Sequence, residues 1–232
     1  ATGDNSTPPA TALSDARVAL DLRSGAIRWH FQATEGDAWN VDCVTPDKDN
    51  CPEDAGPDYD FGTIPILAHG PGGRDYVLAG QKSGIVWAVD ARTGKLAWQR
   101  QVGRGGMAGG VHFGIAESGG RVFVAISDMP DFEEHALPPA PGLHALDLAT
   151  GAVLWHAPAP AGICEGRSLC VPGNSGAITV TPELVLAGSD DGHVRIHDAA
   201  SGAQLWQFDT VADFTTVNGV PARGGAISGG AA

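Results

Sequence analysis

The stretch "DARTGKLAWQRQV", residues 90–102, decides the fold because its spacing recurs three more times in the chain. In every copy an Asp precedes a Gly by four positions, Ser or Thr stands directly before that Gly, and a Trp follows it by four. The four sets are Asp21, Gly25 and Trp29; Asp90, Gly94 and Trp98; Asp147, Gly151 and Trp155; and Asp198, Gly202 and Trp206. Such a repeated spacing predicts an array of similar structural units.

Each copy predicts a β-hairpin. In the second copy, "GIVWAVD" (84–90) is apolar and β-branched, and Asp90 and Thr93 are residues whose side chains hydrogen-bond local backbone amides in turns. Gly94 accepts a positive φ, and "KLAWQRQV" (95–102) then alternates polar and apolar residues, with Trp98 on the apolar face. We therefore predict a buried tryptophan anchor in all four hairpins.

Two more short strands are predicted before three of the copies. They are "TIPILAH" and "DYVLAGQ" (63–69 and 75–81), "VHFGIAE" and "RVFVAIS" (111–117 and 121–127), and "GAITVT" and "ELVLAGS" (176–181 and 183–189). Four consecutive antiparallel strands form one blade of a β-propeller. We thus predict an all-β fold, a single partial propeller domain over residues 1–232, with three complete blades and two partial ones.

The expected blade segments are about 1–34, 62–103, 110–159 and 174–210, and "FTTVNGVPARGGAISGG" predicts the start of a further blade over 214–232. The first and last blades of a closed propeller meet and cover their edges. We therefore expect more sequence on both sides of this chain, and we expect the chain to fold poorly alone.

Composition excludes several classes of function. The formal net charge is −13, and no basic stripe is present to bind nucleic acid. No apolar run reaches the ~18 residues that span a membrane. The acidic surface suits a basic protein partner or serves only solubility. The four cysteines form two local pairs, Cys43 with Cys51 and Cys164 with Cys170; they predict two loop disulfides in a periplasmic or secreted protein, with four free thiols as the alternative.

The tandem "ALD-xx-[TS]-G-xxx-W" pattern resembles the tryptophan-docking repeat of quinoprotein alcohol dehydrogenases. The stretches "ATGDN" (1–5), "TEGDAWNVDC" (34–43) and "AGQKSGIVWAVD" (79–90) support this resemblance. "GPDYDFG" (56–62) and "TVNGVPARGG" (216–225) resemble the polyvinyl-alcohol-dehydrogenase branch in particular. The resemblance covers essentially the whole chain, and it implies an eight-bladed propeller that holds pyrroloquinoline quinone (PQQ) at its axis.

The resemblance also implies a set of cofactor residues. Asp4 stands where the family has a ligand to Ca²⁺, and Asn5 beside it is a second candidate ligand. Lys82 stands where the family has a basic residue against the quinone oxygens. The other positions implied to bind the cofactor are His112, Asn174 and Asn218.

The catalytic position departs from the family pattern. The family's catalytic Asp follows a Trp, whereas Asn40 follows Trp39 here, and an amide cannot act as a general base. Asp37 is the nearest carboxylate, and Asp58 and Asp60 are the alternatives.

Taken together, the resemblance implies oxidation of a secondary alcohol, including a polymeric one. Ca²⁺ acts as a Lewis acid, a carboxylate takes the hydroxyl proton, hydride passes to PQQ, and a cytochrome c takes the electrons. The alternative is a non-catalytic propeller scaffold of the outer-membrane assembly type, which has the same Trp repeat and no cofactor. Lys82 in "GQKSG" and the segment "DAWN" favour the enzyme, because a scaffold has no use for them.

Overall fold

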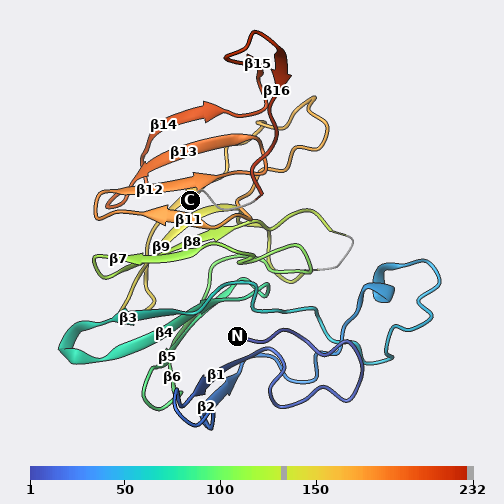
Figure 1. Ribbon diagram of the computed structural model, residues 1–232, viewed down its shortest axis with the longest axis vertical. Coiled ribbons are helices and arrows are strands. Elements are labelled where there is room, and N and C mark those ends of the chain that lie inside the picture. Colours follow the sequence, from blue (N-terminus) through green and yellow to red (C-terminus); the bar gives the residue numbers. More distant parts are fainter. Residues whose placement is uncertain (132–134, 229–232) are drawn as a thin grey trace.

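The structure is a computed structural model that describes residues 1–131 and 135–228. It is nearly all β, with three four-stranded antiparallel sheets and two two-stranded sheets (Figure 1). The described part has two short 3-10 helices, η1 (Val41–Val44) and η2 (Pro71–Gly73), and no helix in it is long and apolar enough to cross a bilayer.

The strands follow one another as meanders. The first sheet holds β1 (Ala16–Leu20) and β2 (Ile27–Gln32). The three four-stranded sheets are β3 (Ile66–His69), β4 (Asp75–Gly80), β5 (Ile85–Asp90) and β6 (Leu96–Gln101); β7 (Ile115–Ser118), β8 (Arg121–Ile126), β9 (Gly142–Asp147) and β10 (Val153–Pro158); and β11 (Ile178–Val180), β12 (Leu184–Gly188), β13 (His193–Asp198) and β14 (Gln204–Asp209). The last sheet pairs β15 (Asp213–Thr215) with β16 (Pro221–Arg223).

The sheets are stacked in chain order (Figure 1). The first strands of neighbouring sheets touch, β3 against β7 and β7 against β11, so these strands form the hub and the repeat tryptophans lie on the outer strands. Apolar residues fill the space between sheets, with Leu78, Val86 and Val124 fully buried between the second and third. This is the arrangement of blades in a β-propeller, as predicted.

The repeated Asp and Gly close the outer hairpin of each sheet in the same way. Asp90 accepts hydrogen bonds from the Thr93 amide at 3.0 Å and the Thr93 hydroxyl at 2.8 Å. Gly94 has φ +70°, and its amide donates to the Asp90 carbonyl at 2.8 Å. The other three turns have the same Asp and Ser or Thr contacts and a Gly at positive φ. The recurring Asp, Ser or Thr, and Gly residues are therefore explained by one turn geometry.

The first three repeat tryptophans dock on the turn of the next repeat. The indole N–H groups of Trp29, Trp98 and Trp155 donate to a backbone carbonyl of the next repeat, at 3.0, 2.9 and 3.2 Å. In each case the acceptor is the carbonyl of the residue directly after the Asp of that repeat. The rings lie on Gly94, Gly151 and Gly202, where an added Cβ would come within 2.7, 2.5 and 2.6 Å of an indole atom. Glycine is thus needed for its backbone conformation and for the space that the indole occupies.

Of the four tryptophans predicted to be buried, Trp98 is 8 % exposed, Trp29 and Trp155 are half-buried, and the prediction was wrong for Trp206, which is 48 % exposed. The physical reason is that no further Asp-x-x-Ser/Thr-Gly turn follows Trp206 in the chain. Residues 213–223 also fold as the β15–β16 hairpin, where the sequence predicted the opening of a blade. The chain then returns to the preceding sheet, and Ile227 packs on Gly188 as Val111 packs on Gly80.

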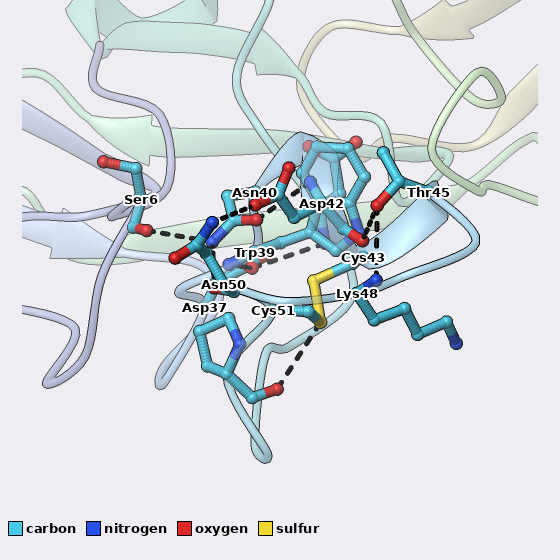
Figure 2. Close-up of a disulfide and its surroundings, with 12 residues drawn as sticks. Ser6, Asp37, Trp39, Asn40, Asp42, Cys43, Thr45, Lys48, Asn50 and Cys51 are labelled. Carbon is cyan, nitrogen blue, oxygen red and sulfur yellow. Dashed lines mark hydrogen bonds between the residues drawn. A yellow bond between two sulfur atoms is a disulfide. The ribbon is translucent and has the colours of Figure 1, made fainter.

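Both predicted disulfides are present, Cys43–Cys51 and Cys164–Cys170. They lie in the long segments that join one sheet to the next, on the side of the molecule opposite the β3–β4 and β5–β6 turns (Figure 1). The first one ties the loop around η1. Its neighbour Asn40 accepts from the Asp42 amide at 3.0 Å and donates to the Asn50 carbonyl at 2.9 Å (Figure 2).

Candidate active site

The β4–β5 turn carries Lys82, and hydrogen bonds of the neighbouring Gln81 side chain hold this turn in place. Gln81 is fully buried, and its amide nitrogen donates to the Tyr59 carbonyl at 2.6 Å and to Thr34 at 2.8 Å. The Gln81 side-chain oxygen accepts from the Trp87 indole at 3.1 Å and from the Ser83 hydroxyl at 2.7 Å. The backbone that presents Lys82 is therefore fixed by one buried amide side chain.

The Lys82 ammonium forms two ion pairs at the edge of the hub. Its Nζ lies 2.8 Å from Asp58 Oδ1 and 2.7 Å from Asp60 Oδ2. Burial alone would lower the pKa of Lys82, but the hydrogen bonds and charges of the two carboxylates outweigh burial and raise it. Lys82 is therefore a stable cation whose position is set by Asp58 and Asp60.

The two carboxyls differ in their protonation. Burial raises the pKa of Asp58 to about 7, against the opposing effect of Lys82. Burial also acts on Asp60, but the Lys82 hydrogen bond and the Asp4 amide hold the pKa of Asp60 below its usual value. Asp60 is the more accessible of the pair, with 24 % of its side chain exposed against 3 % for Asp58. The site thus holds an accessible carboxylate beside a buried carboxyl that titrates near neutral pH.

The N-terminal segment completes this cluster. The Asp4 amide donates to Asp60 Oδ1 at 2.8 Å, and a Cβ on Gly3 would come within 2.3 Å of the same oxygen. Burial and then the charge of Asp60 raise the pKa of Asp4 to about 6. Asn5, in contrast, uses its side-chain oxygen to accept from the Thr11 amide at 2.9 Å. The two predicted calcium ligands therefore contact different residues: Asp4 contacts Asp60, and Asn5 contacts Thr11.

Asp37 lies beneath the segment that carries Asp58 and Asp60. It is 0 % exposed, and its carboxylate accepts from three backbone amides: Tyr59 at 2.8 Å, Asp58 at 3.3 Å and Trp39 at 3.3 Å. Gly56 passes so close that a Cβ there would come within 2.7 Å of Asp37. Asp37 therefore holds the backbone of the loop that carries Asp58 and Asp60.

We expect replacement of Asp37 by Asn to lower the free energy of unfolding by about 2–3 kcal/mol, because the amide turns an N–H₂ group toward buried N–H donors. Urea unfolding of the chain measures this change. Asp54→Asn, an exposed substitution of the same type, is the control and should change stability by less than about 0.5 kcal/mol. Equal effects of the two substitutions would show that Asp37 has no such structural role.

Asp15 is a member of the cluster that the sequence did not reveal. It is 0 % exposed, and neither carboxyl oxygen has a hydrogen-bond partner among residues 1–131 and 135–228. Burial, followed by the charges of Asp37 and Asp60, raises the pKa of Asp15 to about 8. Asp15 is therefore held largely protonated at neutral pH.

This carboxyl makes stability depend on pH. The folded chain binds the Asp15 proton more tightly than the unfolded chain, so stability falls as the pH rises from about 4 to about 8, by at most about 1.4 kcal/mol per pH unit from this group. We expect Asp15→Asn to flatten the dependence in that range, as measured by urea unfolding at several pH values. Asp54→Asn, at an exposed position, is the control that should leave the slope unchanged. A wild-type slope retained in Asp15→Asn would contradict the assignment.

His112 borders the cluster from the segment between β6 and β7. Its ring stacks on Phe113 with 4.6 Å between centroids, and its Nδ1 is buried without a hydrogen-bond partner among the described residues. Burial, and then the positive charge of Lys82, lowers the pKa of His112. The structure thus places a neutral imidazole with an unused nitrogen within electrostatic reach of Lys82.

The remaining predicted residues have other partners. The Asn174 side chain donates to the Gly188 carbonyl of β12 at 2.8 Å, and its backbone amide donates to the Ile126 carbonyl of β8 at 3.0 Å. Asn218 is exposed in the β15–β16 turn beside Thr216, and Asn40 caps η1. Within the described residues, no hydrogen bond or ion pair joins these three side chains to Lys82. The structure brings Asp4, Asp58, Asp60 and His112 together around Lys82, with Asp37 beneath them.

The acidic residues of this cluster are candidate metal ligands. In the part of the chain that the structure describes, no three His, Cys, Asp or Glu side chains are arranged to hold a metal ion. Asp4, Asp15 and Asp60 supply hard oxygen atoms, which suit Ca²⁺, but they do not form a coordination shell. No catalytic step is therefore assigned to a metal.

Comparison with known proteins places the chain in a family. The family model described as outer membrane protein assembly factor BamB, PQQ_2, matches residues 14–128 and 82–226. The chain belongs to the PQQ_2 family. This match covers the tryptophan repeats from the first hairpin to β16.

Two curated relatives are similar over nearly the whole chain. A polyvinylalcohol dehydrogenase of Pseudomonas sp. is 41 % identical over 219 residues, and one of Sphingopyxis sp. (strain 113P3) is 38 % identical over 222 residues, each covering 93 % of the chain. The chain spans about a third of these relatives, 33 % and 34 % of their lengths. The crystal structure of a quinohemoprotein alcohol dehydrogenase from Comamonas testosteroni superposes with a TM-score of 0.58 at 17 % identity, over 93 % of this chain and 36 % of that one, and it supports the propeller fold.

Proposed function

We propose that this PQQ_2 chain is part of a PQQ-dependent alcohol dehydrogenase that oxidises a secondary, polymeric alcohol of the polyvinyl alcohol type. The observation that carries the proposal is the 41 % identity to a polyvinylalcohol dehydrogenase across 93 % of the chain. The Lys82 cluster supports the proposal. Burying a cation beside a carboxylate costs desolvation free energy, and a scaffold has no use for such a charged cluster.

The residues present fit a carboxylated quinone. Lys82 uses two of its three N–H donors on Asp58 and Asp60, so one donor is left for a quinone oxygen. The unused Nδ1 of His112 offers a second polar contact beside it. PQQ, when bound, supplies the hydride acceptor that no side chain provides. We assign Lys82 and His112 to cofactor binding, and we keep no such role for Asn174 and Asn218, whose contacts lie elsewhere.

Asp60 is the carboxylate that we assign as general base. Its lowered pKa keeps it ionised at neutral pH, and its exposed edge is open to a substrate hydroxyl. Lys82 holds the Asp60 carboxylate in place and stabilises negative charge that develops nearby. Asn40, at the position of the family's catalytic Asp, and Asp37, the nearest carboxylate, have their side-chain oxygens on backbone amides, and we assign them to positioning.

Calcium and the electron acceptor belong to the same proposal. Asp4 would offer Ca²⁺ one carboxylate, and further oxygen ligands, water included, would complete the coordination shell. Electrons leave to a cytochrome c. The two disulfides support a periplasmic or secreted location, where such bonds persist.

The test uses the full-length protein that contains this chain. After addition of PQQ and Ca²⁺, we expect dye reduction that depends on polyvinyl alcohol or a short secondary alcohol, and no reduction without PQQ. Absence of both PQQ binding and turnover would leave the scaffold function, which the family description also carries.

A further inference from the structure

Gln81 contacts both halves of the Lys82 cluster. It stands directly before Lys82 on the β4–β5 turn, and its side-chain N–H₂ group donates to the Tyr59 carbonyl at 2.6 Å. Tyr59 lies between Asp58 and Asp60 in the chain, and these are the two acids that pair with the ammonium. One side chain therefore connects the backbone of the cation to the backbone of both carboxyls.

The amide of Gln81 has one favourable orientation. Its N–H₂ group donates to the Tyr59 carbonyl and to the Thr34 hydroxyl oxygen, at 2.6 and 2.8 Å. Its oxygen accepts from the Trp87 indole and the Ser83 hydroxyl, at 3.1 and 2.7 Å. These contacts use both N–H donors and both lone pairs of a side chain that is fully buried. Turning the amide over would set its oxygen against a carbonyl and its N–H₂ group against an indole N–H, so the contacts fix its orientation.

The backbone of Tyr59 is held on both sides by buried side chains. Its carbonyl accepts from Gln81, and its amide donates to Asp37 Oδ2 at 2.8 Å. Asp58, the residue before it, has φ +57°, in the left-handed region that a residue with a side chain adopts only at a cost in free energy. The loop conformation that presents the two acids therefore depends on the contacts that hold Tyr59.

The β12–β13 turn provides a comparison within the same chain. Its sequence "AGSDDG" (187–192) corresponds to "AGQKSG" (79–84), and in both turns the amide of the last Gly donates to the carbonyl of the third residue at 3.0 Å. Ser189 stands at the position of Gln81, and its hydroxyl donates to the Gly173 carbonyl at 2.8 Å. Both side chains thus bind the segment that enters their sheet, but the glutamine is longer and has a second N–H donor.

The next residue of the two turns shows what differs between them. The backbone amides of Lys82 and Asp190 make the same contact, to the carbonyls of Asp60 and Gly173 at 3.1 and 3.0 Å. The Asp190 side chain accepts from the amide and hydroxyl of Ser175, whereas the Lys82 side chain holds two acids. The backbone contact is therefore common to both turns, and the glutamine accompanies the charged cluster.

We propose that Gln81 is a positioning residue of this site. By holding the Tyr59 carbonyl, it keeps both acids within hydrogen-bond distance of the Lys82 ammonium. A side chain as short as serine, or one without N–H donors, releases the loop and lengthens the two ion pairs. The effect of Gln81 on catalysis rests on the proposed function, in which Lys82 and Asp60 act on cofactor and substrate; its effect on the Lys82 ammonium does not.

Acetylation of Lys82 by acetic anhydride in the cofactor-free, full-length protein tests the proposal without turnover. Only the free amine reacts, so an ammonium held by two carboxylates is protected. Peptide mass spectrometry measures the rate relative to the exposed Lys95 in the same sample. We expect Gln81→Ser to raise the relative rate by about 10-fold, the equivalent of one lost buried hydrogen bond.

Two further variants make this measurement specific. Gln81→Met keeps the length of the side chain without its donors and should raise the rate as Gln81→Ser does, so it decides the matter if the serine variant does not fold. Ser189→Ala removes the corresponding bond of the β12–β13 turn and should leave the rate for Lys82 within about twofold of the wild type. Circular dichroism confirms that the variants fold. Equal acetylation of Lys82 in the wild type and the folded Gln81 variants overturns the proposal.

Turnover of the PQQ-loaded protein supplies the second readout. Gln81→Ser should lower kcat by about 10-fold, and in the Lys82→Met background it should lower kcat no further, because Gln81 acts through Lys82. The same fold loss in both backgrounds would contradict a positioning role. A wild type without turnover would contradict the proposed function and leave the acetylation result standing, whereas normal wild-type turnover with unchanged acetylation would contradict this inference alone.

Discussion

Replacing Lys82 with Met in the full-length protein is expected to lower kcat/KM for the alcohol by about 10²- to 10³-fold, the usual loss when one preorganised charge at a reacting oxygen is removed. Met matches the length of the lysine stem, so the change removes the charge and leaves most of the packing. It also leaves Asp58 and Asp60 side by side without their cation, which we expect to lower the free energy of unfolding by about 3 kcal/mol.

Two further variants separate catalysis from stability. Lys95→Met changes an exposed lysine and should leave both quantities unaltered. Combining Lys82→Met with Asp58→Asn removes the repulsion between the carboxyls, so we expect most of the stability to return while kcat/KM stays low. Dye-reduction kinetics and urea unfolding measure the two effects. Activity that recovers together with stability would mean that Lys82 acts only through the fold.

The fold was predictable because its determinant is local and repeated. Asp90, Thr93 and Gly94 close a turn with their own backbone, and the same three residue types do so in every repeat. The docking of Trp98 on Gly151 is not local, but it recurs at a constant position in the repeat. The exposure of Trp206 could not be predicted from its own repeat, because burial of each indole depends on the repeat that follows.

The site was less predictable, because its residues come from segments far apart in the sequence. Lys82 could be predicted from its position in the "GQKSG" turn. Asp58 and Asp60 look like ordinary acids in a loop until the Lys82 ammonium is placed between them. Asp15 carries no signal at all in "SDARV", since nothing near it in sequence shows that it is fully buried.

Asn5, Asn40 and Asn174 stay predictions from the family pattern, as a calcium ligand, at the position of the catalytic Asp and as a cofactor contact. Within the described residues their side-chain amides bond to nearby backbone and hydroxyl groups. Short amide side chains in loops find such partners readily, and this competes with any role toward a ligand. The position of an asparagine in a family motif therefore predicts where the residue lies but not what its side chain binds.

Replacing Gly151 with Ala is expected to lower the free energy of unfolding of the chain by about 3–5 kcal/mol. The left-handed backbone at φ +69° costs an L-residue about 1–2 kcal/mol. The new methyl group would also lie 2.5 Å from the Trp98 ring, so the ring must move away from residue 151. That movement breaks the 2.9 Å bond from the indole N–H to the Leu148 carbonyl and opens a cavity beside a tryptophan that is 8 % exposed.

Gly25→Ala is the matched control, because it places the same methyl group at the same backbone conformation, φ +71°, with no atom within 4 Å. It should cost only the backbone part, about 1–2 kcal/mol, when urea unfolding is measured at a dilution that keeps the chain monomeric. The difference between the two variants is then the free energy of one tryptophan dock. Equal losses would show that glycine is required in these turns for backbone conformation alone, and that the indole contributes little to holding neighbouring blades together.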